Sequence, residues 1–540
     1  MEKQQQLEKC AQLLSKRSTD DEKLAGLLLV PRIIDVQDSE SLGYIFEAMD
    51  AKFLERLLRT GMKRLVKQSS DLDTDTSGES PMLGIAVAVI AVFASHSTIA
   101  QQAKMVDRIP TLYKVAVLGV ANVSAEATQA LCKILALDAG IQRILEQPES
   151  FVEAIAPVNA GIENIGALEV IDFALNRSST FIHAQDNVAR FASGWSYLVA
   201  HIASAFGTTQ GALKFELMGV LASSLEPIDS EDATAIDNTA SCSLIIANIS
   251  SGCIWVLRQK SETSKYADQA LVLYSHLVRL WPNHTFSSKA DITLVGPGSE
   301  PTRQKDAELV LRLACIEGQA SIDTMMISRP VSMNQNDSVQ RSERARTRLG
   351  WKFPTCAEIA AGWLEWIDQW LDAQSESADV GEDAIYELMS EVQKLSQAAI
   401  GFLVDFRERM GDEKEMMNVS PELVLSSIRL LGQWLATDPK LHKAALPVLA
   451  MSTNWILQGG EYSKAINDYM RPCVSFALDT CDISKAQYID DLKTRQSHLD
   501  RKITQSMASP WFGTIEFDDL ARAVYNIPSD EDILRARREA

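Results

Sequence analysis

Apolar residues recur at helical spacing along almost the whole chain. Leu, Ile, Val, Phe and Ala return three and four positions apart, whereas strict alternation of apolar and polar residues rarely extends beyond a few positions. A spacing of three and four places side chains on one face of an α-helix, while a strand needs a period of two. The pattern therefore predicts an all-α protein.

The predicted helices are separated mostly by short polar or turn segments. They are expected at residues 20–35, 40–49, 51–58, 82–95, 125–137, 164–175, 188–206, 213–225, 239–258, 266–280, 307–326, 356–371, 384–410 and 422–436. Consecutive helices with short linkers must bury their apolar faces against one another, which predicts an armadillo/HEAT-like α-solenoid of stacked helix pairs. The helix at 20–35 is apolar on nearly all sides, so we expect it to be an inner helix covered by its neighbours.

Changes in composition predict four parts of the chain. Residues 1–327 form an N-terminal helical-repeat region, and residues 350–478 form a C-terminal one. Residues 328–349 between them offer no apolar face for packing and are expected to be a flexible polar and basic loop. Residues 479–540 are expected to be a polar, weakly structured tail.

Composition narrows the function classes. With 46% hydrophobic residues the 540-residue chain can bury a large core. Its 72 acidic and 52 basic residues give a net charge of −20, which repels phosphate backbones, so no nucleic-acid partner is expected. The charged start of the chain lacks the pattern of a secretory signal, which predicts a cytoplasmic protein.

Two further patterns agree with a cytoplasmic location. The longest apolar run, residues 82–94, is shorter than the roughly 20 residues that cross a bilayer, so we expect a buried helix there and no membrane span. The eight cysteines are scattered without a C-x-x-C pair. Reduced and mostly buried thiols are therefore expected.

The motifs of catalysis, cofactor binding and metal binding are incomplete. Asp71, Asp73 and Asp75 have the spacing of the first ligands of an EF-hand loop, but Thr76 and Met82 stand where that loop needs Gly and Glu. A solvated acidic loop is the preferred interpretation. The seven histidines show no zinc-binding spacing, and no phosphate-binding glycine loop or nucleophile elbow occurs. We predict no catalytic residues, no cofactor and no metal ligands.

Two side-chain groups in the second half of the chain are candidate interaction sites. Trp363, Trp366 and Trp370 share one helix face and either form a binding hot spot or, as we prefer, pack in the core. A basic cluster is formed by Arg341, Arg344, Arg346 and Arg348. This cluster is a candidate partner-binding site for an acidic protein or a nuclear import signal, and equally it is consistent with the solvated first turns of a helix.

Short apolar motifs also resemble a known family. They are the segments AGLLLV (25–30), IFEA (45–48), RLL (56–58), KFEL (214–217), LACIE (313–317) and, most clearly, SIRLLGQWLA (427–436). Their order and spacing over residues 20–460 resemble those of the neurochondrins, which are armadillo-like helical proteins. These are packing motifs, so they indicate a fold more than a mechanism.

The resemblance implies a non-enzymatic scaffold or adaptor that binds other proteins. In animal relatives the partners are receptor tails and a calcium/calmodulin-dependent kinase, and the roles are neurite outgrowth and neuronal signalling. No site residue is implied for this chain. Two alternatives stay open: a transport adaptor that uses the basic cluster for acidic cargo, and an all-α enzyme with an unrecognised site.

Overall fold

The structure of the protein is a computed structural model that describes part of the chain. That part comprises residues 2–34, 38–70, 81–119, 121–159, 165–185, 188–259, 264–286, 300–327, 336–373, 382–409 and 420–437, with isolated residues between 441 and 469. Within these ranges the regular structure is helical, and no strand occurs. The all-α prediction is confirmed.

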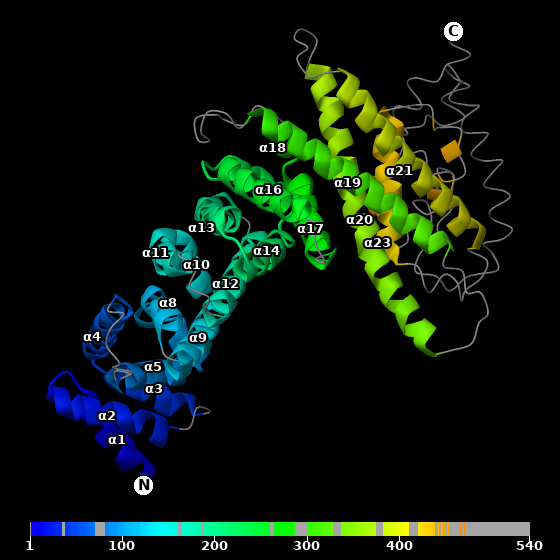
Figure 1. The fold of residues 1–540 in the computed structure, drawn as a ribbon. Coiled ribbons are helices and arrows are strands. Elements are labelled where there is room, and N and C mark those ends of the chain that lie inside the picture. The colour runs from blue at the N-terminus through cyan, green and yellow to red at the C-terminus, as the bar shows by residue number, and fades with distance from the viewer. Residues whose placement is uncertain are drawn as a thin grey trace, which may run out of the picture. The chain divides into compact units, whose positions relative to one another are not determined.

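The chain divides into two compact units, Met1–His276 and Leu277–Ala540, at a point inside helix α17. The helices of unit 1 are α1 (Glu2–Leu14), α2 (Asp20–Ile33), α3 (Ser39–Ala48), α4 (Ala51–Ser70), α5 (Pro81–Ala94), α6 (Ser97–Ala100), α7 (Ala103–Val106), α8 (Ile109–Leu118), α9 (Ala121–Leu135), α10 (Asp138–Glu146), α11 (Pro148–Asn159), α12 (Ile165–His183), α13 (Ala189–Thr208), α14 (Ala212–Leu225), α15 (Ser230–Asp237), α16 (Cys242–Arg258) and most of α17 (Ser264–Leu280). Figure 1 labels most of these helices in chain order, from blue to green.

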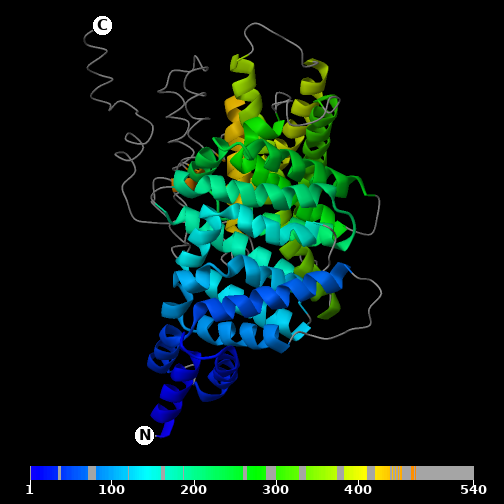
Figure 2. The same cartoon turned by 90° about the vertical axis from the view of Figure 1, so that its left-hand side faces the viewer.

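Helices three positions apart in the chain pack against each other in unit 1. This holds for α2 with α5, α8 with α11, α9 with α12, α10 with α13, and α13 with α16. Each step of the stack therefore adds about three helices, as in armadillo-like solenoids, and each step buries the apolar face of the step before it. Figure 2 shows the resulting layers of unit 1 between the blue and green ends.

Two of the predicted helices in unit 1 differ in how they are buried. Helix α5 is enclosed by its neighbours, as its apolar run predicted, and Val87, Ile90 and Phe93 have no more than 1% of their surface exposed. Helix α2 buries Leu27 and Val30 but leaves Leu28 45% exposed. The expectation that this helix is covered on nearly all sides is therefore wrong, because one of its faces lies at the surface of the unit.

Unit 2 contains α18 (Pro282–Phe286), α19 (Glu300–Ile327), α20 (Asn336–Ala373), α21 (Glu382–Arg409) and α23 (Pro421–Thr437). Helix α20 packs on both α19 and α23, and α21 packs on the same two helices. Trp363 is buried, and Trp366 contacts Phe286 with 6.0 Å between ring centroids, so core packing is the better interpretation for these two residues. The side chain of Trp370 lies outside the described part.

The predicted division of the chain differs from the observed one. Helix α20 begins at Asn336, so residues 336–349 of the predicted loop are helical, and residues 328–335 lie outside the described ranges. The units meet at His276 and Leu277 rather than at residue 328. Residues 479–540, predicted to be a tail, also lie outside the described ranges.

The cysteines of the described segments are free thiols, and most are buried. Cys10, Cys242, Cys253, Cys315 and Cys356 are buried, and Cys132 is half-buried. Burial raises the pKa of Cys10 to about 11 and that of Cys315 to about 12. The prediction of reduced, mostly buried thiols is confirmed for these residues, while Cys473 and Cys481 lie outside the described ranges.

Of the helices described, none is by itself long and apolar enough to cross a bilayer. The bent pair α15 and α16 meets the length and composition requirement only when its two helices are taken together.

Candidate functional site

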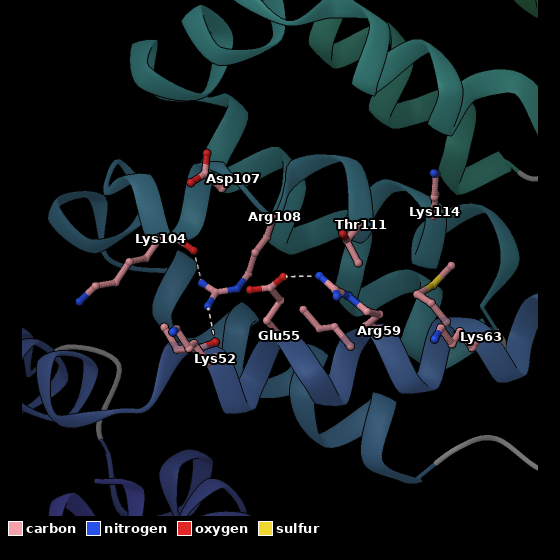
Figure 3. Close-up of a pocket in the computed structure, with 12 residues that line it drawn as sticks. Lys52, Glu55, Arg59, Lys63, Lys104, Asp107, Arg108, Thr111 and Lys114 are labelled. Carbon is pink, nitrogen blue, oxygen red and sulfur yellow. Dashed lines mark hydrogen bonds and ion pairs between the residues drawn. The ribbon is translucent and has the colours of Figure 1, made fainter. Parts of the chain in front are cut away.

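An open groove of about 740 Å³ lies between helix α4 and the short α7–α8 segment of unit 1. We call it the cationic groove and define it by its lining residues Ala51, Lys52, Glu55, Leu58, Arg59, Met62, Lys63, Lys104, Asp107, Arg108, Thr111 and Lys114. Figure 3 shows α4 on one side of it and α7 and α8 on the other, with the guanidinium of Arg108 directed toward α4 and Lys114 directed away from α4. Six of these residues are cationic and two are carboxylates, in a chain whose net charge is −20.

Helical periodicity places the charged residues of each wall on one face. On α4, Lys52, Glu55, Arg59 and Lys63 follow one another at intervals of three or four residues and are exposed, while Leu54 and Leu57 between them are buried. On the opposite wall Arg108, Thr111 and Lys114 follow one another at intervals of three from the N-cap of α8, and Lys104 on α7 lines the groove beside them. Two amphipathic segments therefore present their polar faces to the same space.

A close contact behind the groove sets the position of α4. At Gly61 an added Cβ atom would lie 2.7 Å from the Cβ of Leu83 on α5. That distance is shorter than real Cβ contacts allow, so only glycine lets the two helices approach this closely. The apolar floor of the groove, formed by Leu58 and Met62, is held against the core in this way.

Both carboxylates of the groove already have partners. The carboxylate of Glu55 accepts a hydrogen bond from Arg59 at 2.7 Å, and that of Asp107 pairs with Arg143 at 2.8 Å. Lys104 pairs at 3.3 Å with Glu47, in an exposed ion pair of the kind that contributes little stability. Lys52, Lys63 and Lys114 have no side-chain partner among the described residues.

Arg108 is the buried member of the group, with only 7% of its surface exposed. Its guanidinium donates hydrogen bonds to the carbonyl of Lys104 and, at 3.4 Å, to the carbonyl of Ala51, so it links α4 to α7. Its Nε atom is buried without a hydrogen-bond partner in the described structure. Burial lowers the pKa of Arg108, and the nearby charges of Glu55 and Asp107 offset only part of that effect. The guanidinium also donates to the Sδ atom of Met105 at 3.8 Å. The site therefore holds a desolvated cation whose direct hydrogen bonds go to neutral acceptors, and an anion in the groove would stabilise it.

A second polar cluster lies at the end of α12. The Nδ1 atom of His183 lies 3.0 Å from a carboxylate oxygen of Asp232 and 3.6 Å from one of Asp229. These ligand atoms lie within 4.8 Å of one another, which is close enough for the three side chains to hold a divalent cation. The sequence predicted no metal ligands, because His183 and the two aspartates are far apart in the chain.

The same cluster has a structural role that explains its geometry. Asp229 is the N-cap of α15, and its Oδ1 accepts hydrogen bonds from the backbone amides of Glu231 and Asp232. Asp232 is buried, and its carboxylate pairs with the imidazole of His183. The hydrogen bond to Asp232 raises the pKa of His183, and the charges of both aspartates act in the same direction. The cluster therefore works as an ion pair that ties α12 to α15.

This ion pair predicts that stability falls as the pH rises. The pKa of His183 is higher in the folded state than in the unfolded state, where it is about 6.5. The contribution of His183 to the free energy of unfolding is therefore fully present below pH 6.5 and is lost as the pH rises through the pKa of the folded state. We expect His183→Gln to destabilise the protein by less than about 1 kcal/mol at pH 6, since the imidazole is half exposed, and by still less at pH 8.5. Thermal unfolding at the two pH values measures the difference.

His201 provides the matched comparison for that measurement. Burial lowers the pKa of His201, so the contribution of His201 to stability must increase as the pH rises, opposite to that of His183. Equal losses for His183→Gln at both pH values would contradict the assignment of the ion pair.

The sequence comparisons identify the family of the chain. The family model described as Neurochondrin matches residues 1–450, which include all of unit 1 and most of the described part of unit 2. The chain belongs to the neurochondrin family. The resemblance inferred from the short apolar motifs is thereby confirmed.

Two curated relatives show how far the family likeness extends. Neurochondrin from Xenopus laevis is 21% identical over 441 residues, which cover 80% of this neurochondrin-family chain and 53% of the relative. The Neurochondrin homolog of Drosophila melanogaster is 30% identical over 111 residues, covering 20% of the chain and 14% of the homolog. The chain thus spans about half the length of the Xenopus relative that it matches.

Solved structures of other helical proteins resemble the chain only loosely. A structure from work on a phosphorylation switch in the interaction between cadherin and β-catenin has a TM-score of 0.30 at 12% identity and covers 92% of this chain and 94% of its own. Importin β, crystallised with ammonium sulfate, has a TM-score of 0.29 at 12% identity, and the match covers 93% of this chain and 62% of the importin β chain. At these scores no residue and no partner can be transferred from either structure.

The structure also locates the residues singled out in the sequence of this neurochondrin-family chain. Arg341, Arg344, Arg346 and Arg348 all lie in helix α20, and their side chains are outside the described part. Asp71, Asp73 and Asp75 fall between α4 and α5, also outside the described ranges. The structure therefore does not test the predicted basic cluster. It shows a second candidate interaction site, the cationic groove, which the sequence did not predict.

Sequence reasoning missed the groove because its cations come from two separate segments. The basic cluster at 341–348 is dense in sequence, whereas the lysines and arginines of α4 are spaced by a turn and those of α7 and α8 lie about fifty residues further on. One signal was available. In residues 51–67 six basic residues accompany one acidic residue, in a chain with an excess of acidic residues.

Proposed function

We propose that the chain is a non-enzymatic adaptor that binds other proteins through the surface of its helical stack. Membership of the neurochondrin family, the repeat packing of unit 1 and the open form of the cationic groove support this proposal. An open groove lined by cations suits the binding of a polypeptide segment better than it suits a reaction that needs an enclosed pocket. By analogy with animal relatives, the adaptor modulates intracellular signalling and acts in the cytoplasm.

The cationic groove is the proposed recognition surface, and its occupant is an acidic segment of a partner protein. The observation that carries this proposal is that Lys52, Lys63 and Lys114 have no side-chain partner among the described residues, while the guanidinium of Arg108 donates its hydrogen bonds to neutral acceptors. The chain as a whole carries 20 more acidic than basic residues, so its net charge repels an acidic segment while the groove attracts it. The groove therefore provides specificity as well as affinity.

Charge reversal on the groove walls tests this function. Replacing Lys52, Lys63 and Lys114 together by Glu is expected to weaken the binding of a Glu-rich peptide by at least about tenfold. Binding by the wild-type chain should also weaken as salt increases, because the contacts are solvent-exposed charges. Fluorescence anisotropy with a labelled peptide at several salt concentrations measures both effects.

A matched control uses cations that lie outside the groove. Lys16, Arg17 and Arg64 are exposed and line no part of it, although Arg64 lies on the same helix as Lys63. Replacing these three by Glu changes the net charge by the same amount. If this control variant loses as much affinity as the groove variant, binding follows net charge alone and the groove has no special role.

A second candidate surface is the basic cluster Arg341, Arg344, Arg346 and Arg348, which we propose as a site for acidic cargo. Its support is that a single helix, α20, carries all four positions within two turns. Replacing all four by Ser should abolish the capture of acidic cargo in a pull-down with the full chain. Unchanged capture would eliminate this site and leave the cationic groove as the remaining candidate.

A further inference from the structure

Five of the six cations of the groove lie toward its two ends. Figure 3 shows Lys52 and Lys104 at one end, with the guanidinium of Arg108 between them, and Lys63 and Lys114 at the other end. Glu55 and Arg59, which are paired with each other at 2.7 Å, lie between the two ends. An elongated ligand with negative charge at two points matches this distribution better than a single compact anion does.

The helix geometry fixes the distance between the two ends. Lys52 and Lys63 are eleven residues apart on α4, which corresponds to about 16 Å along the helix axis at 1.5 Å per residue. An extended peptide rises about 3.3 Å per residue, so about five residues cover the same distance. Two anionic side chains about five positions apart in an extended segment would therefore reach both ends together.

The two ends differ in their chemistry. At the first end Lys52, Lys104 and Arg108 supply three cations, of which Lys104 also pairs with the exposed Glu47 at 3.3 Å. Arg108 is a desolvated cation that donates to two backbone carbonyls. A phosphoryl group carries a charge of about −1.5 to −2 at neutral pH and offers three acceptor oxygens, so it can engage several cationic donors at once. A carboxylate brings only one charge. The first end therefore favours a phosphoryl group over a carboxylate.

The second end has only Lys63 and Lys114, which are flexible point charges on opposite walls. A carboxylate that reaches this end can accept a charge-assisted hydrogen bond from either lysine. Since the six cations of the groove exceed its two carboxylates by four, a phosphoryl group and a carboxylate together neutralise most of the excess.

We infer that the cationic groove selects an extended segment with a phosphorylated Ser or Thr at the Lys52–Lys104–Arg108 end and an acidic residue about five positions away at the Lys63–Lys114 end. This inference rests on the proposed function, in which the groove binds an acidic segment of a partner protein. It adds control of the interaction by phosphorylation of the partner.

Four fluorescein-labelled peptides test the inference on the full chain by anisotropy. The first carries phosphoserine and Glu five positions apart in a Gly/Ser background, and the second has Ser in place of phosphoserine. The third has Glu at that position, and the fourth has the phosphoserine and the Glu two positions apart. The first peptide should bind at least about tenfold more tightly than the second, because an additional charge-assisted contact has that effect, and also more tightly than the third and the fourth.

Paired variants assign the two ends of the groove. Lys52→Gln with Lys104→Gln should remove the preference for phosphoserine over Glu, whereas Lys63→Gln with Lys114→Gln should remove the dependence on spacing. Gln keeps most of the side-chain length, and circular dichroism confirms that each variant is folded. Lys16→Gln with Arg64→Gln is the control, and its binding of all four peptides should equal that of the wild type.

The outcomes separate this inference from the function on which it rests. Equal affinity for the Glu peptide and the phosphoserine peptide would overturn the phosphate preference while the acidic-segment function stands. Failure of every acidic peptide to bind would overturn both. Binding of phosphatidylserine vesicles through these lysines, with no binding of peptides, would also overturn both and would indicate a membrane surface as the ligand.

Discussion

Replacing Trp195 by Ala is expected to lower the free energy of unfolding of unit 1 by about 3 to 5 kcal/mol. The Trp195 side chain on α13 has none of its surface exposed, and its indole Nε1 donates a hydrogen bond to Ser179 Oγ at 2.9 Å. Ser179 on α12 lies in turn 2.6 Å from the carbonyl of Ser224 on α14. Three consecutive helices meet at this point, so the truncation leaves a cavity and removes the indole donor from a shared network.

The measurement is urea unfolding followed by circular dichroism, with hydrogen exchange to locate the effect. Amides of α12, α13 and α14 should lose protection first, because these helices share the cavity. Tyr44→Ala on α3 is the control, since Tyr44 is 53% exposed and its removal should change stability by less than about 0.5 kcal/mol. If Trp195→Ala is as mild as this control, the packing described for α12, α13 and α14 is wrong.

Lys214→Ala is expected to destabilise unit 1 by about 2 to 4 kcal/mol, a large effect for the loss of a lysine. Only 1% of the Lys214 surface is exposed. Its Nζ donates hydrogen bonds to the carbonyls of Phe206 at 2.6 Å and Thr209 at 3.2 Å, and it lies 4.9 Å from the ring centroid of Trp255. The ammonium therefore satisfies carbonyls at the C-terminal end of α13, where the helix dipole also favours a cation.

A second substitution at this position separates packing from hydrogen bonding. Lys214→Met keeps the volume of the aliphatic part of the side chain but removes the ammonium that donates to the carbonyls of Phe206 and Thr209. We expect it to lower the free energy of unfolding by about 1 to 3 kcal/mol, which is less than the loss caused by Lys214→Ala. Lys16→Ala, at an exposed lysine, should be nearly neutral. A neutral Lys214→Met would show that the side chain contributes by packing alone.

Helical periodicity was sufficient to predict most of the long helices. The segments predicted at 213–225 and 266–280 differ from α14 (Ala212–Leu225) and α17 (Ser264–Leu280) by no more than two residues at either end. In these segments the apolar positions recur over several turns between clear polar boundaries. The family resemblance could be predicted from the same residues, because the packing of the helices depends on them.

The short helices and the candidate site could not be predicted in this way. Helices α6 (Ser97–Ala100) and α7 (Ala103–Val106) each last about one turn, which is too short for a periodic pattern. Lys214 was noted in the sequence only as part of the motif KFEL, since nothing local shows that a lysine is buried beneath a neighbouring helix end. The cationic groove depends on tertiary packing that brings α4 against α8, and residue spacing does not encode that contact.

The enclosed thiols make the chain a reporter of its own local opening. Thiolates are the species that react with maleimides and iodoacetamide, and burial raises the pKa of Cys10 and Cys253 on different helices of unit 1. Modification at either position must wait until the surrounding helices separate. The rate at which each cysteine is alkylated therefore reports how often that segment of the stack opens, one position at a time and without an engineered cysteine.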